Sequence, residues 1–160
     1  YIELPKKLTV EQNLVVYGKL YSVKNLKSRI EYLTSKLRLE ELLNKITGEL
    51  SSGQKNRVSL AKALINDPKI LFLDEPTASL DPETGDFVRS FIEKISKEKN
   101  MSILLASHNM NEVKRLCKKV LMMKDGCLID QGTPDDLIKK HGKTNLEEVF
   151  LKLNRSENEF

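Results

Sequence analysis

The feature that most constrains the fold is a run of four large apolar residues, Ile70 to Leu73, that ends in two carboxylates, Asp74 and Glu75. The run is too short for the apolar face of a helix and lacks the alternation of a strand with one wet face. It therefore predicts a central strand of a parallel sheet, covered on both faces, in an α/β fold. Such sheets bind ligands at the carboxyl edge of their strands. Taken alone, Asp74 and Glu75 would favour an Asp-Glu-Pro turn that merely ends a strand.

A helix that begins in a serine-rich segment is expected before this strand. Small and polar residues precede apolar positions at helical spacing, so Ser51 or Ser52 is the expected N-cap. The helix should end near Pro68, because proline disfavours α geometry in the residue before it. A helix N-terminus with a hydroxyl and a glycine, Gly53, can bind an anion. The alternative is an ordinary helix cap with no ligand.

A loop, another helix and another strand follow the carboxylates. Asp81 and Pro82 suit the N-cap and first position of a helix, and an apolar stripe over residues 87–95 predicts that this helix packs on the sheet. Residues 102–106 predict a second short strand, which His108 follows closely. Taken alone, His108 would be a cap or a surface histidine.

In this order and at this spacing, the three elements resemble the ATPase engine of ATP-binding cassette (ABC) proteins, over nearly all of the chain. Residues 50–54 are similar to the signature motif, residues 70–75 to the Walker B strand, and Ser79 to Asp81 to the D-loop. The chain has serine at position 52, where the family most often has glycine.

The resemblance implies a role for each site residue. The signature residues would cap the γ-phosphate of an ATP that is held by the P-loop of a second subunit; they are Ser51, Ser52, Gly53 and Gln54. Asp74 would hold Mg²⁺, usually through water, and Glu75 would take the proton of the attacking water. Asp81 would lie near the subunit boundary, and His108 would touch the γ-phosphate and sense hydrolysis.

No P-loop is recognisable in the sequence. Gly48 to Gly53 has the glycine spacing, but residues 54–56 are not Lys followed by Ser or Thr. The segment ending in Gly142, Lys143 and Thr144 has Leu137 where the first glycine should stand, and Gly142 is a better helix C-cap. The chain is therefore expected to begin after the P-loop, as a fragment or a truncated gene product, and to have no ATPase activity alone.

The two ends of the chain predict further helices. Thr9 with Gln12 is a capping-box pattern, and residues 1–50 suggest three helices, similar to the helical subdomain inserted in ABC ATPases. Residues 120–129 predict a hairpin with an Asp-Gly turn, and Thr133 and Asn145 begin two more helices. This tail resembles that of ATPases serving type-2 exporters. The predicted domains are 1–50 (helical subdomain), 51–131 (signature helix and second half of a RecA-like core) and 132–160 (C-terminal helices).

Composition argues against a membrane-spanning segment and against a nucleic-acid-binding surface, and it adds little else. The chain is 39% hydrophobic and 31% charged, with no apolar run near the ~18 residues of a membrane span and no visible signal peptide. Cys117 and Cys127 are expected to be buried thiols in a reducing compartment. The net charge of +4 is mild and no nucleic acid is expected; the basic residues at 114, 115, 118 and 119 suit a solvated helix face, and His141 a structural role.

Together these features predict an α/β chain: an incomplete P-loop NTPase (RecA-like) core with an all-helical subdomain on its N-terminal side. The resemblance implies an ABC exporter subunit that binds ATP and Mg²⁺, pairs with a second ATPase subunit, and attaches to the cytoplasmic face of the membrane through a permease. Three alternatives stay open: a soluble ABC ATPase of translation or DNA repair, a non-catalytic half-cassette that binds a partner, and a decayed gene without function.

Overall fold

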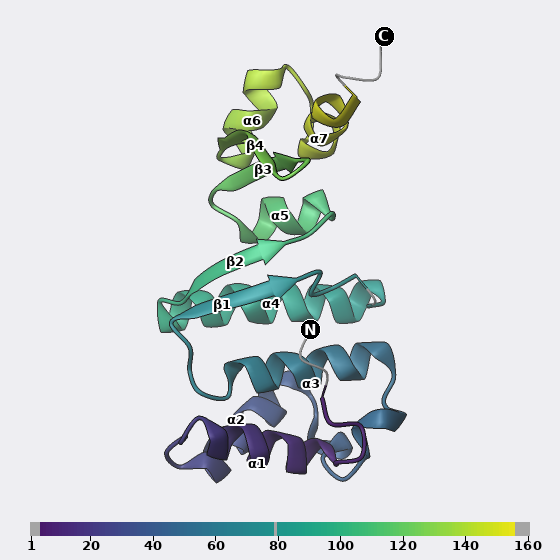
Figure 1. The fold of residues 1–160 in the computed structure, drawn as a ribbon, viewed down its shortest axis with the longest axis vertical. Coiled ribbons are helices and arrows are strands. Elements are labelled where there is room, and N and C mark those ends of the chain that lie inside the picture. Colours follow the sequence, from purple (N-terminus) through teal and green to yellow (C-terminus); the bar gives the residue numbers. More distant parts are fainter. Residues whose placement is uncertain (1–3, 79, 156–160) are drawn as a thin grey trace. The chain divides into compact units, whose positions relative to one another are not determined.

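A computed structural model describes residues 4–78 and 80–155 of the chain, which form an α/β structure (Figure 1). Ser79, in the expected D-loop, lies outside the described residues. The chain divides into two compact units, residues 1–104 and residues 105–160. The domain limits predicted after residues 50 and 131 stay a prediction.

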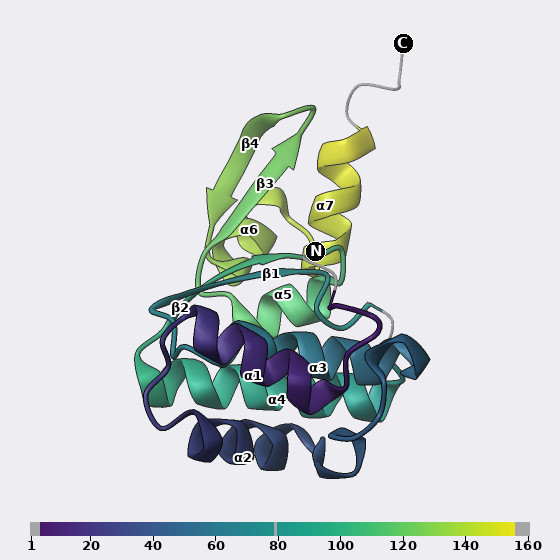
Figure 2. The same ribbon diagram turned by 60° about the horizontal axis from the view of Figure 1, so that its bottom comes forward.

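Three α-helices form the N-terminal part of the first unit: α1 (Val10–Leu20), α2 (Leu26–Leu37) and α3 (Ser52–Leu64). The predicted capping box of α1 is confirmed, because Thr9 Oγ1 accepts the Gln12 N–H at 3.1 Å and Gln12 Oε1 accepts the Thr9 N–H at 2.9 Å. The three helices pack on one another, with α1 beside α3 (Figure 2). Their fully buried side chains include Val10, Leu14, Leu33, Leu37 and Leu64.

The third helix predicted before residue 50 is wrong. That segment holds two 3₁₀ turns, η1 (Glu40–Leu42) and η2 (Thr47–Glu49). Its backbone groups bond outside the segment: the carbonyls of Leu43 and Lys45 accept the N–H groups of Glu11 and Val10, both at 3.0 Å. The segment thereby satisfies N–H groups in the first turn of α1 that have no partner within the helix. Within the segment the backbone bonds span three residues, as from the Lys45 N–H to the Leu42 carbonyl at 2.9 Å, which is the 3₁₀ pattern and not the α-helical one.

A β–α–β unit follows α3. Strand β1 (Ile70–Asp74) and strand β2 (Ser102–Ala106) are hydrogen-bonded neighbours, and their arrows point the same way in Figure 1. The connecting helix α4 (Pro82–Lys99) begins at the predicted cap, Asp81, whose Oδ1 accepts the Thr84 N–H at 3.0 Å. The buried positions of its stripe include Val88, Ile92 and Ile95.

The prediction that β1 is covered on both faces is wrong for the described residues. Leu71 is 3% exposed, but its neighbours Ile70 and Phe72 are 57% and 71% exposed. Successive side chains of a strand point to opposite faces, so one face of β1 is packed and the other is open. Consecutive apolar residues mean that both faces of the strand could be buried. In this structure only one face of the two-stranded sheet is covered.

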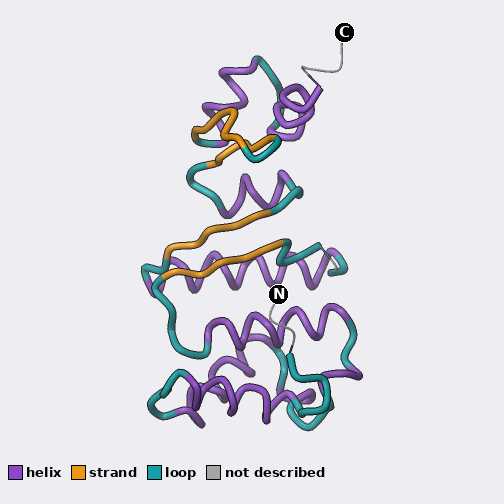
Figure 3. Tube along the Cα trace, viewed as in Figure 1, coloured by secondary structure: helices purple, strands orange, loops and turns teal. Residues whose placement is uncertain are grey.

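The second unit combines a β-hairpin with helices, which are orange and purple respectively in Figure 3. Its elements are α5 (Met110–Leu116), β3 (Val120–Lys124), β4 (Cys127–Gly132), α6 (Pro134–His141) and α7 (Leu146–Arg155). The Asp-Gly turn is confirmed, with Asp125 and Gly126 both at positive φ, 48° and 77°. The predicted C-cap Gly142 is also confirmed, with φ of 62°. The core of this unit contains Val113, Val120, Met122, Leu137, Leu146 and Val149.

Two expectations about this unit are wrong. Cys127 is exposed, because the two-stranded hairpin leaves one face open, while Cys117 is half-buried. Burial and the nearby Glu112 carboxylate raise the pKa of the Cys117 thiol. Helix α5 ends at Leu116, so Lys118 and Lys119 lie beyond it and form no common helix face with Lys114.

Among residues 4–78 and 80–155, no helix has both the length and the apolar character needed to cross a membrane.

His141 has the structural role expected for it, as part of a charged cluster that joins β4 to α6. The Asp130 side chain is 7% exposed; its Oδ2 lies 2.6 Å from His141 Nε2, and its Oδ1 accepts a hydrogen bond from Lys140 Nζ at 2.7 Å. The hydrogen bonds from Lys140 and His141 lower the pKa of Asp130 to about 2. Because this value lies below that of an unfolded Asp, the cluster stabilises the fold above about pH 4 and loses its effect as the pH falls towards 2.

We expect Asp130→Asn to lower the melting temperature by about 5 °C at neutral pH, because charge-assisted hydrogen bonds are lost. The difference from the wild type should shrink as the pH is lowered from 5 towards 2. Thermal melts followed by circular dichroism over this range would measure it. The control is Asp135→Asn, since Asp135 is 86% exposed and its ion pair with Lys114 is 3.6 Å long. A difference independent of pH would contradict the assignment.

Candidate functional site

The N-terminus of α3 is capped by its own side chains. Ser51 Oγ accepts the Gln54 N–H at 3.2 Å, and Gln54 Oε1 accepts the Ser51 N–H at 3.0 Å. Ser51 is thus the N-cap, one of the two candidates that the sequence offered. The Gln54 side chain turns back to the cap, while Ser51 and Ser52 are exposed. The helix tip is accessible to a ligand and has the N–H groups that favour an anion.

Ser52 fits its position without backbone strain. It is the first helical residue of α3, and it is not among the residues with positive φ. The helix tip can therefore have a serine where the resembling family mostly has glycine. Gly53, by contrast, has little room: a Cβ added there would lie 3.3 Å from Leu80 Cδ2. The tip of α3 consequently lies against the loop that follows the carboxylates.

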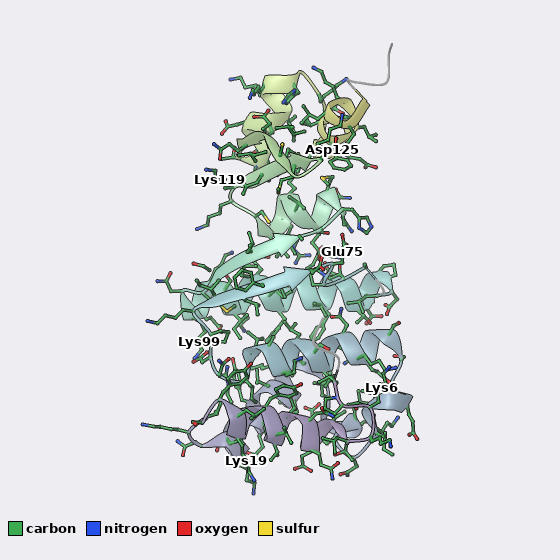
Figure 4. The ribbon with its side chains drawn as sticks, in the orientation of Figure 1. Lys6, Lys19, Glu75, Lys99, Lys119 and Asp125 are labelled. Carbon is green, nitrogen blue, oxygen red and sulfur yellow. The ribbon has the colours of Figure 1, made fainter. Side chains whose placement is uncertain are left out.

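The two carboxylates lie at the carboxyl end of β1. Asp74 is the last residue of the strand and is exposed, and Glu75 follows it, half-buried (Figure 4). Glu75 has φ of 47°, a left-handed conformation that costs a non-glycine residue about 1 kcal/mol or more. Such strain persists only where the surroundings hold it, and it is most frequent at functional sites. No pattern in the sequence predicts this conformation.

The loop after Glu75 is fastened at both ends. The Ala78 N–H bonds the Glu75 carbonyl at 3.3 Å, and Arg89 Nη1 donates to Thr77 Oγ1 at 3.3 Å from α4. At its far end Asp81 caps α4, and hydrogen bonds from the side chain and backbone of Thr84 lower the pKa of Asp81. Asp81 therefore has a confirmed structural role, and its place at a subunit boundary stays a prediction.

His108 belongs to the second unit, in the loop between β2 and α5. Its side chain is exposed, and the residues on either side of it are hydrogen-bonded. Ser107 Oγ donates to Glu112 Oε2 at 2.7 Å, and the Asn109 N–H donates to Ser107 Oγ at 3.1 Å. The sequence analysis did not single out Glu112. A glutamate three residues after an Asn N-cap was the signal available.

Arg57 is a second residue that the sequence analysis missed. From α3, its Nη1 donates to the carbonyls of Leu37 and Arg38 at 2.9 and 2.8 Å, at the end of α2. Burial and the neighbouring Arg38 lower the pKa of Arg57. The Arg38 guanidinium lies 4.3 Å from the centre of the Phe87 ring. A shallow cavity of about 260 Å³ is lined by Arg38, Arg57, Glu83, Thr84 and Phe87.

The donors at the end of β1 suit a magnesium ion that is only partly held by protein. No group of three or more His, Cys, Asp or Glu side chains in residues 4–78 and 80–155 could enclose a metal. Mg²⁺ keeps several waters and uses one or two carboxylates together with substrate phosphates. The exposed Asp74 carboxylate fits that requirement, and the ion would neutralise phosphate charge.

Sequence comparison relates the chain to transport ATPases. Residues 2–78 match the family model "ABC transporter". The ABC transporter ATP-binding protein NatA of Bacillus subtilis is 34% identical over 147 residues, covering 91% of this chain and 59% of NatA. The Nod factor export ATP-binding protein I of Bradyrhizobium diazoefficiens is 36% identical, covering 92% and 48%. Methionine import ATP-binding protein MetN 1 of Bacillus anthracis is 39% identical, covering 93% and 42%. The chain thus spans about half the length of these relatives.

Solved structures agree with this relationship. A structure described as the ATP binding subunit of an ABC transporter superposes with a TM-score of 0.81 and 26% identity, over 94% of this chain and 64% of that one. The dimeric, post-hydrolysis ATP-binding cassette MJ0796 bound to ADP and Pi has a TM-score of 0.74 at 23% identity, over 83% and 60%, and supports the fold alone. The predicted fold class, α/β with the P-loop NTPase architecture of ABC ATPases, is confirmed. By sequence and by fold, the chain is similar to the ATP-binding domains of ABC transporters.

Proposed function

We propose that this chain supplies the signature helix and the catalytic carboxylates of an ABC transporter subunit that binds and hydrolyses ATP. The observation that carries the proposal is the closeness of Gly53, at the tip of α3, to Leu80 in the loop after Glu75: a Cβ added to Gly53 would lie 3.3 Å from Leu80 Cδ2. The accessible, capped N-terminus of α3 therefore lies beside the loop that follows the two carboxylates, Asp74 and Glu75. Each of these features has a structural explanation alone, but their adjacency suits a site that handles a terminal phosphate.

The chemistry assigned to the site follows from the groups present. Glu75 accepts the proton of the water that attacks the γ-phosphate, and Asp74 holds Mg²⁺ through water. Ser51, Ser52 and Gly53 offer a hydroxyl and backbone N–H groups to the phosphate. His108 senses the γ-phosphate that the water attacks, and Asp81 lies near the subunit boundary. Gln54 supports the site by holding the cap.

The proposal includes two partners. A second ATPase subunit supplies the P-loop that grips the ATP bound at this signature helix, and the paired subunits close on ATP and reopen after hydrolysis. A permease anchors the pair to the cytoplasmic face of the membrane. Residues 1–50 form the helical subdomain that passes the motion on, residues 51–131 the ATPase part, and residues 132–160 the C-terminal helices.

Export is the transport direction we favour. The tail that contains Gly132, Thr133 and Pro134 resembles that of type-2 exporter ATPases, and one relative is named for Nod factor export. Import is the second candidate, because the relatives named for methionine import are up to 39% identical. Uptake and efflux measurements on a strain lacking the gene would separate the two directions.

ATP-dependent pairing tests the proposed function. The Glu75→Gln substitution, made in the ATPase-active protein, should allow ATP binding but not hydrolysis. The molecular mass of this variant, measured by light scattering, should double when ATP and Mg²⁺ are added. With ADP it should stay that of one subunit. ADP lacks the γ-phosphate that the signature helix of the partner would bind. A mass that is the same with ATP and ADP would contradict closure around the γ-phosphate.

A further inference from the structure

The loop that contains His108 rests on a buried carboxylate. Glu112 is 1% exposed, and its Oε2 accepts the hydrogen bond of the Ser107 hydroxyl at 2.7 Å. The Ser107 oxygen in turn accepts the Asn109 N–H at 3.1 Å. Asn109 Oδ1 accepts the N–H groups of Asn111 and Glu112, each at 3.1 Å. These bonds form a closed chain that passes around His108 from one neighbour to the other.

This chain of bonds fixes the backbone on both sides of an exposed imidazole. Ser107 cannot move without breaking its bond to Glu112, and Asn109 is bonded both to Ser107 and to the first turn of α5. Helix α5 has only seven residues, so its own hydrogen bonds hold the loop weakly. The buried carboxylate therefore attaches the His108 loop independently of the backbone hydrogen bonds of α5.

A carboxylate is a costly choice for this position. Burial of a charged group costs free energy unless hydrogen bonds compensate it, and an apolar side chain would fill the same space more cheaply. The Glu112 carboxylate also affects a neighbouring group, since burial and this carboxylate together raise the pKa of the Cys117 thiol. What the carboxylate adds, and an apolar residue would not, is an acceptor that orients the Ser107 hydroxyl.

We propose that Glu112 is a positioning residue for His108, acting through Ser107 to hold the imidazole where it meets the γ-phosphate. The inference rests on the proposed function of His108. It assigns to Glu112 no contact with substrate. Gln at this position would keep an oxygen acceptor for Ser107, whereas Ala would not.

A double-mutant cycle with His108 tests the inference in the ATPase-active protein. Glu112→Ala should lower kcat by about 10- to 100-fold with little change in KM for ATP, the range seen when a group that orients an active residue is lost. Glu112→Gln should stay within about threefold of the wild type. In a His108→Ala background, Glu112→Ala should lower kcat by no more than about twofold further, because its effect passes through the imidazole.

The controls separate a positioning role from a merely structural one. Glu147→Ala removes an exposed glutamate from α7 and should leave kcat unchanged. If Glu112→Ala does not fold, Ser107→Ala breaks the same chain of bonds with less disturbance and takes its place in the cycle. Unchanged kcat in the single variant, or a loss that multiplies with that of His108→Ala, overturns the inference alone. Full turnover in His108→Ala overturns the proposed role of His108, and this inference with it.

Discussion

Replacement of Glu75 by Gln is expected to reduce ATP turnover by a factor of about 10²–10⁴ while ATP binding is retained. The amide has nearly the shape of the carboxylate but does not accept the proton of the attacking water. The loss corresponds to roughly 3–5 kcal/mol of activation free energy. Steady-state phosphate release and equilibrium nucleotide binding, measured on the ATPase-active protein, would give the two quantities separately.

Gln is the informative replacement because it preserves the backbone conformation. Glu75 has φ of 47°, and Gln has the same limited tolerance for that region as Glu, so the strain in the loop is unchanged. The unfolding midpoint should therefore match that of the wild type. Glu98→Gln, on an exposed glutamate of α4, is the control for the loss of one negative charge. Wild-type turnover in Glu75→Gln would remove Glu75 from the role of general base.

The sequence predicted best those features whose cause is local. The capping box at Thr9, the N-cap expected at Ser51 or Ser52, the cap at Asp81 and the Asp125-Gly126 turn each depend on a few adjacent residues and on one or two hydrogen bonds. Short polar side chains satisfy the first N–H groups of a helix wherever the helix packs. These features could therefore be predicted without knowledge of the tertiary structure.

The errors arose where the outcome depends on distant partners. Leu39 and Leu42 are buried as their apolar character suggests, but the segment forms 3₁₀ turns whose carbonyls also bond to the first turn of α1. The exposure of Phe72 and Cys127 depends on whether another element covers that face of each sheet. Composition and periodicity record the preference of a side chain for burial, and they do not reveal which surface is available to cover it.

The candidate site was predictable in its residues more than in its geometry. Ser51 and Asp74 lie where motif spacing predicted, at a helix tip and a strand end. The left-handed conformation of Glu75, the contact of Gly53 with Leu80, and the bonds of Arg57 to the end of α2 left no signal in the sequence. The last two require segments that meet only after folding.

The second large effect is expected at Gly53, where Gly53→Asp should nearly abolish ATP turnover. An aspartate in the first turn of α3 favours the helix dipole, so the helix should persist. Its charge, however, would stand where the proposed γ-phosphate binds. Two like charges 4 Å apart repel by roughly 4 kcal/mol near a protein surface, which corresponds to a loss on the order of 10³-fold. Phosphate release and nucleotide-dependent pairing would both report it.

Gly53→Asn makes the charge effect separable from crowding. Asn has nearly the same size as Asp, so both side chains meet Leu80 Cδ2, which lies 3.3 Å from the position of an added Cβ. Leu80 Cδ2 is at the far end of a flexible side chain and can shift. The neutral variant should therefore lose much less turnover than the charged one. The ratio between the two variants isolates the electrostatic contribution, and it should fall as salt screens the charges. Equal losses in Asp and Asn would mean that Gly53 serves only the packing of α3 against the loop, and the anion site at this helix tip would have to be abandoned.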